Sequence, residues 1–167
     1  DGKFVLPGLI DSHSHISLHQ GELPGVKYTS TAEFCTLWAA RSVARVLHAG
    51  VTSIAVPGGK WFTDVTVREA VAGGLLQGPR MVVGGRALTN YRSIFDPDPF
   101  PSYEGQPDDT VGILCNTREK FIVETRKQIK RGVDLVKIAD SYWGDLQSVA
   151  DEEIQAVVDE AHRHNVK

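Results

Sequence analysis

The chain has 167 residues, of which 41% are hydrophobic and 23% are charged, and its formal net charge is -3. This composition is typical of a globular α/β domain and argues against a disordered chain or a nucleic-acid-binding surface. No apolar run reaches the roughly 18 residues that cross a membrane, and no leader-like segment opens the sequence, so we expect a cytoplasmic protein without membrane contact. Two cysteines, Cys35 and Cys115, are too few for a disulfide framework and are expected to be reduced.

The chain begins with an apolar run, Phe4 to Ile16, that ends in two histidines separated by one residue. The run predicts a strand buried on both faces, as in a covered parallel sheet. Because alternate side chains of a strand share a face, we expect Asp11, His13 and His15 to lie together. Two converging imidazoles suit zinc or a similar ion, although the same triplet also fits two polar side chains at a strand end.

Helices and strands alternate through the rest of the chain. A capping box at Ser30 to Glu33 predicts the start of a helix that ends at Gly50. Its expected inner face consists of Phe34, Leu37, Trp38, Ala44 and Leu47. Further strands are predicted at 52–56, 80–84 and 133–139, and further helices at 63–76, 116–131 and 151–164. At the helix-to-strand junctions, Gly50, Gly132 and Asn165 are expected in the left-handed conformation.

This alternation predicts an α/β fold of parallel strand-helix units joined by right-handed crossovers. Four such units are half of an eight-unit TIM-type barrel, and Val166-Lys167 stands where a fifth strand would begin. We therefore interpret residues 1–167 as the N-terminal half of a (β/α)8 barrel without strands five to eight. A half-barrel leaves open edges and an uncovered inner face, so we expect self-association or a missing C-terminal half.

The proline-containing stretch from Gly85 to Cys115 excludes regular structure and is interpreted as a lid or substrate loop. Tyr91 and Arg92 lie in it and are candidate substrate-binding residues. Arg92 could hold a substrate carboxylate with two parallel hydrogen bonds, although a solvated loop arginine is the simpler interpretation.

Lys137 lies in the apolar strand predicted at 133–139, where an unpaired ammonium is expensive to desolvate. It can be paired with an acid such as Asp134, Asp140 or a residue elsewhere in the chain. It can also have a depressed pKa and form a Schiff base with a carbonyl substrate. A third possibility is carboxylation by carbon dioxide, which makes an anionic ligand able to bridge two metal ions. With His13 and His15 on the first strand, the third possibility is favoured.

Five segments together resemble the amidohydrolase superfamily, in its imidazolonepropionase-like and Xaa-Pro dipeptidase (prolidase-like) branch. They are P-G-L-I-D-S-H-S-H, G-V-T-S-I-A-V, G-P-R-M-V-V-G-G, G-V-D-L-V-K-I and E-E-I-Q-A-V-V-D-E-A-H-R-H. The resemblance implies a metal-dependent hydrolase in which His13 and His15 bind the more buried metal and Lys137, carboxylated, bridges two zinc ions. It also implies two more histidines and a base aspartate beyond Lys167, and a flanking β-sandwich that the chain lacks.

The first hypothesis is thus a metal-dependent amidohydrolase that cleaves C-N bonds of a dipeptide or N-acyl amino acid with a metal-bound hydroxide. The chain alone is then expected to be inactive, because the orienting acid and part of the metal shell lie outside it. A second hypothesis is a non-catalytic half-barrel that self-associates. A third is a Schiff-base lyase that uses Lys137.

Overall fold

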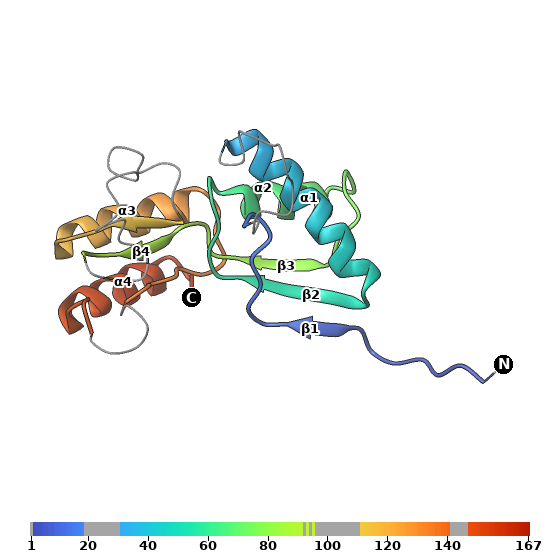
Figure 1. Ribbon diagram of the computed structural model, residues 1–167. Helices are drawn as coiled ribbons and strands as arrows, with labels where there is room; N and C mark the ends of the chain where they lie inside the picture. Colours follow the sequence, from blue (N-terminus) through green and yellow to red (C-terminus); the bar gives the residue numbers. More distant parts are fainter. Residues whose placement is uncertain (1, 19–30, 92, 94, 96–110, 141–146) are drawn as a thin grey trace.

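The computed structural model describes residues 2–18, 31–91, 93, 95, 111–140 and 147–167 of the chain (Figure 1). Its elements follow the order β1 (Leu9–Asp11), α1 (Ala32–His48), β2 (Val51–Val56), α2 (Thr63–Ala72), β3 (Arg80–Val83), β4 (Ala87–Thr89), β5 (Gly112–Leu114), α3 (Arg118–Lys130) and α4 (Asp151–Arg163). Among these described elements, no helix has the length and apolar character needed to cross a membrane.

All pairings between the strands are parallel, as the alternation of helices and strands predicts. β1, β2 and β3 form one sheet in that order, and β4 pairs with β5 in a second. Helices α1 and α2 lie side by side over the same face of the first sheet (Figure 1). Gly50, Gly132 and Asn165 have φ angles of 89°, 87° and 57°, which confirms the left-handed junctions.

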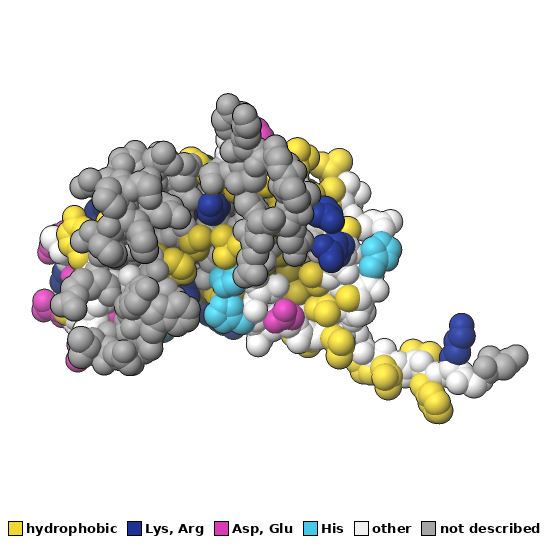
Figure 2. Space-filling model, viewed as in Figure 1, with side chains coloured by type: hydrophobic (Ala, Val, Ile, Leu, Met, Phe, Trp, Pro, Cys, Tyr) yellow, Lys and Arg dark blue, Asp and Glu magenta, His cyan; other side chains and the backbone are white. Residues whose placement is uncertain are grey.

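β1 is shorter and more exposed than predicted. It ends at Asp11 and, among the described strands, pairs with β2 alone; its three residues are exposed, so it is an open edge strand rather than one covered on both faces. The apolar side chains before and within it reach solvent, with Phe4 92% and Ile10 76% exposed. Figure 2 shows these hydrophobic side chains along the extended N-terminal segment.

The strand predicted at 133–139 is wrong in extent. This segment makes one parallel bridge, between Ile138 and Leu88 of β4. On its other side, the N–H of Val136 donates to the carbonyl of Lys167 at 2.6 Å. A ladder needs consecutive partners. On the side away from β4, Lys167 is one such partner, and it lies where the sequence predicts the next strand to begin.

The N-terminus and the buried face of α1 also differ from the prediction. Thr31, not Ser30, is the N-cap, and its hydroxyl accepts from the N–H of Phe34 at 3.2 Å. The buried side chains of α1 are Cys35, Trp38, Ala39 and Val43. Leu37 is 73% exposed, because the apolar stripe is rotated relative to the predicted one.

The stretch from Gly85 to Cys115 is not wholly irregular, because β4 and β5 lie near its two ends. β4 follows β3 directly after Gly84 and Gly85. Gly85 has a φ of 65°, and a Cβ there would lie 2.4 Å from Oε1 of Gln128, so this bend requires glycine. The prolines at 97, 99 and 101, which carried the prediction of a lid, lie outside the described residues.

Candidate metal site beyond the first strand

The two histidines that follow β1 lie next to each other. Their ring centroids are 5.1 Å apart, with an interplanar angle of 67°. Strand alternation is not the cause, because β1 ends at Asp11 and the carboxylate of Asp11 accepts the backbone N–H of His13 at 3.0 Å. Ser14 still donates to the carbonyl of Ala55 at 2.9 Å, which keeps this segment against β2. Both imidazoles are exposed and can be reached by a ligand.

The ring of His15 is oriented by the loop after β2. Its Nδ1 lies 2.8 Å from the carbonyl oxygen of Gly58. Because a carbonyl only accepts, Nδ1 carries the proton in this contact and the neutral ring keeps its lone pair on Nε2. A hydrogen bond on one ring nitrogen is the usual way in which proteins orient a metal-binding histidine through the other.

Lys137 lies on the face of its segment that points away from the helices. Its neighbours Val136 and Ile138 pack against the core cluster that contains Phe121 of α3 and Val157 of α4. Because the bridge to β4 holds the segment extended, the side chain between those neighbours belongs to the opposite face. Lys137 is half-buried there.

The segment just before Lys137 lies beside the end of β2. Leu135, two residues before Lys137, lies beside Gly84: a Cβ on Gly84 would be 2.7 Å from Cδ1 of Leu135 and 3.2 Å from Cα of Pro57. Pro57 directly precedes Gly58, the partner of His15. Leu135, two residues before Lys137 in the chain, therefore packs near the loop that orients His15.

The acids considered as partners of Lys137 are occupied elsewhere. The carboxylate of Asp134 accepts from Arg68 at 2.6 Å, and that of Asp140 accepts from the backbone N–H of Ser148 at 2.7 Å. In the described part of the chain, the ammonium of Lys137 makes neither an ion pair nor a hydrogen bond. Pairing with either acid is therefore wrong.

The donor atoms fit a divalent ion of the zinc type, although they do not complete its shell. Zinc takes imidazole nitrogen and carboxylate-like oxygen, usually four ligands in all. Among the described residues, no group of three or more His, Cys, Asp or Glu side chains is arranged to hold a metal. His13 and His15 would thus need further donors, and a carboxylated Lys137 would supply two oxygens.

Tyr91, one of the two candidate substrate residues, lies just beyond the carboxyl end of β4. Tyr91 is 61% exposed, and its backbone N–H donates to the side-chain oxygen of Asn116 at 2.9 Å. Its phenol is thus free to meet a ligand on the edge of the sheet where barrel enzymes keep their sites. Arg92 lies outside the described residues.

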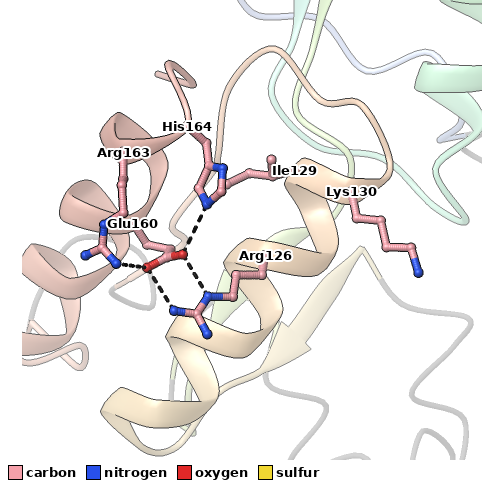
Figure 3. A pocket seen from close by; sticks show the side chains of 6 residues that line it. All are labelled: Arg126, Ile129, Lys130, Glu160, Arg163 and His164. Carbon is pink, nitrogen blue, oxygen red and sulfur yellow. Dashed lines mark hydrogen bonds and ion pairs between the residues drawn. The ribbon is translucent and has the colours of Figure 1, made fainter.

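A groove of about 480 Å³ between α3 and α4 contains none of these residues (Figure 3). Its lining consists of Arg126, Ile129, Lys130, Glu160, Arg163 and His164. The buried carboxylate of Glu160 accepts from Nε of Arg126 at 2.7 Å and lies 3.2 Å from Arg163 and 3.4 Å from His164. The hydrogen bond from Arg126 is the main cause that lowers the pKa of Glu160. Arg126, Arg163 and His164 are directed at Glu160, whereas Lys130 points away from it, so we interpret the first three with Glu160 as a clamp between helices (Figure 3).

Sequence reasoning missed the backbone carbonyl that orients His15. In the sequence, Pro57-Gly58-Gly59 indicates only the end of the strand predicted at 52–56. Adjacent glycines after a barrel strand also signal a close approach by another part of the chain. At Gly58, however, a Cβ would meet Cγ1 of Val111 at 3.7 Å and Cε1 of His15 at 3.9 Å, which is ordinary van der Waals contact, so this glycine by itself does not point to His15.

Parallel β/α units with paired imidazoles beyond the first strand define the class: a TIM-barrel type of chain with a candidate metal centre at the carboxyl ends of its strands. The amidohydrolase family model matches residues 4–167, and the chain belongs to this family. No curated protein matches it.

Solved structures share the fold. A prolidase complexed with N-methylphosphonate-L-proline has a TM-score of 0.80 and 27% identity over 99% of this chain and 42% of its own. An Xaa-Pro dipeptidase with bound methionine has a TM-score of 0.76 and 22% identity over 96% of this chain and 41% of its own. An ochratoxinase from A. niger has a TM-score of 0.79 and 22% identity over 95% and 41%. The chain thus spans less than half the length of these neighbours.

Proposed function

We propose that the chain is the N-terminal part of a metal-dependent amidohydrolase that cleaves an amide or peptide bond of a small substrate, such as a dipeptide or N-acyl amino acid. The observation that carries the proposal is the pair of imidazoles 5.1 Å apart, one of which is hydrogen-bonded to Gly58 through Nδ1. The dipeptide class rests on the prolidase, which is 27% identical and whose bound molecule contains proline.

In this proposal His13 and His15 donate ring nitrogens to a divalent ion, zinc in the first instance, and Lys137 acts as a carbamate that bridges to a second. Such ions lower the pKa of water toward neutrality and polarise a carbonyl. Gly58 fixes the proton of His15 on Nδ1. The position of Lys137 on the face away from α3 and α4 supports its role, because a bridging group must reach the inside of the barrel.

The proposed substrate contacts and the remaining ligands rest on other observations. Tyr91, exposed at the carboxyl end of β4, is the proposed contact to the substrate, together with Arg92. The general base and the other ligands would come from the part of the neighbours that this chain does not span. The chain by itself is accordingly expected to be inactive, and measurable hydrolysis of Xaa-Pro dipeptides by purified chain would contradict this.

Metal analysis and intact mass test the proposal. With zinc and bicarbonate present, the chain should retain zinc, and native mass spectrometry should show one added carboxyl group that is absent from Lys137→Ala. Loss of zinc on gentle dialysis together with an unmodified Lys137 would overturn it. Trapping of a carbonyl substrate at Lys137 by borohydride would favour the Schiff-base lyase instead.

A second candidate is favoured by the exposed edge of the sheet. Phe4, Val5, Leu6, Leu9 and Ile10 are between 64% and 97% exposed, and such an apolar edge tends to associate. As a non-catalytic half-barrel the chain would form dimers or larger species. Light scattering should then show a concentration-dependent mass, and Ile10→Lys should reduce it, whereas a monodisperse monomer at high concentration would exclude this role.

A further inference from the structure

The carbonyl that orients His15 belongs to a loop held from two other elements. The loop after β2 contains Gly58, Gly59 and Lys60. The N–H of Gly59 donates to the carbonyl of Gly85 at 2.8 Å, and the N–H of Lys60 donates to the hydroxyl of Ser17 at 3.0 Å. The two residues after Gly58 are therefore both anchored.

Ser17 is one of these anchors and is only 1% exposed. It lies two residues beyond His15, so one short segment supplies the imidazole and also binds the loop that orients it. The fit is tight: a Cβ on Gly59 would lie 2.9 Å from Oγ of Ser17. The hydroxyl thus occupies a space that only glycine leaves open.

Asp64 is the second anchor, and it acts on the loop indirectly, through Gly85. Its buried carboxylate accepts the N–H of Gly85 at 2.8 Å and the N–H of Val65 at 2.9 Å. Burial raises the pKa of Asp64, and the backbone donors oppose this rise. Asp64 thereby holds Gly85, and the carbonyl of Gly85 holds Gly59.

We infer that Ser17 and Asp64 are positioning residues for His15: through Lys60 and Gly85 they fix the 58–60 loop so that the Gly58 carbonyl holds the proton of His15 on Nδ1 and leaves Nε2 as the donor atom. The inference deepens the proposed function and rests on it for the purpose of that donor atom. Neither residue touches a ligand. Each acts through the backbone, as outer hydrogen bonds do around metal-binding histidines.

The test is the tautomer of His15 in the metal-free 167-residue chain, read from two-bond ¹H–¹⁵N correlation spectra at pH 8.5. The Nδ1–H form should exceed the Nε2–H form about tenfold, the ratio that one net hydrogen bond supports. In Ser17→Ala the ratio should fall about fivefold or more. Gly59→Ala, which pushes on the same hydroxyl from the other side, should have the same effect while keeping Ser17.

Asp64→Asn should produce a smaller fall, because its amide oxygen can still accept one of the two N–H donors. The control is Ser42→Ala, which removes a hydroxyl that bonds to its own helix at the carbonyl of Trp38, and it should leave the ratio unchanged. Backbone chemical shifts of β2 and β3 show which variants remain folded, and the folded ones decide the result.

An unchanged His15 tautomer in folded Ser17→Ala and Gly59→Ala would overturn the inference. So would a wild-type ring that lacks the Nδ1–H preference. Zinc titration of the same samples separates this outcome from the proposed function. A wild-type chain with the expected tautomer but no zinc binding would remove the proposed function and leave the positioning network standing. Zinc binding together with an unaltered His15 tautomer in the variants would leave the proposed function standing and remove the positioning network.

Discussion

Each half of the chain is stabilised internally by a different combination of forces. The first half, β1 to β3 with α1 and α2, has an apolar core cluster of Ile16, Ala39, Val43, Ile54, Val56, Val67 and Val83. The second half has the core cluster Leu88, Cys115, Phe121, Val149 and Val157, and its buried carboxylates, Glu124 and Glu160, are paired with cations, whereas the buried carboxylate of Asp64 in the first half accepts backbone N–H groups. The first half carries the histidines and the second carries Lys137, so the candidate site needs both. Packing secures one part of it, and packing plus charge secures the other.

The largest effect is expected from the apolar core of the second half. Phe121 on α3 is fully buried, and Phe121→Ala should lower the free energy of unfolding by about 3–5 kcal/mol through lost burial and a cavity. Val123→Ala on the same helix, where the side chain is 44% exposed, should change it by less than about 1 kcal/mol. Urea unfolding followed by circular dichroism measures both, and equal effects would show that α3 does not pack as described.

The next largest effect separates charge from packing. Glu160→Gln should lower the free energy of unfolding by about 1–2 kcal/mol at pH 7, a modest value because the cations of its clamp are half exposed. The hydrogen bond from Arg126 lowers the pKa of Glu160 below its ordinary value of 4.5. Since the folded state favours the carboxylate, this stability is present above about pH 4.5 and is lost as the pH falls through the lowered pKa.

The wild type and Glu160→Gln should therefore converge in stability on acidification, because Glu160 loses the charge that faces Arg126, Arg163 and His164. Unfolding measured at pH 7, 5 and 3 checks this. A difference between the two proteins that persists unchanged at pH 3 would contradict the clamp.

The smallest effect compares one matched feature in the two halves. Thr31 caps α1 and Thr117 caps α3, each through a hydroxyl that accepts an N–H three residues on at 3.2 Å. Thr31→Ala and Thr117→Ala should each lower the free energy of unfolding by about 1 kcal/mol. Hydrogen exchange should show fraying at the affected helix only. Loosening of both helices by either variant would mean that the halves unfold as one unit.

The alternation of elements and their left-handed junctions follow from the sequence because Gly50, Gly132 and Asn165 act locally. What the sequence did not show depends on distant partners. The segment around Lys137 is extended as predicted, but its ladder needs neighbours that only the fold supplies. Leu37 is apolar yet exposed, since helix periodicity alone left the orientation of the stripe open.

The candidate site divides in the same way. The His-x-His spacing marks His13 and His15 in the sequence. The contact between His15 and Gly58 joins residues 43 positions apart and uses a backbone atom, which no residue pattern encodes. Ser17 and Asp64 likewise look like ordinary polar residues until their buried partners are known.

The proposed function depends above all on His13 and His15 binding a divalent metal ion together. Equilibrium dialysis of the chain against zinc, followed by metal analysis, tests it most directly. We expect zinc to be retained by the wild type and by His48→Ala, which alters an exposed histidine on α1, and retention to fall at least tenfold in His13→Ala and His15→Ala. Equal zinc retention by all four proteins, or none by the wild type, would contradict the claim.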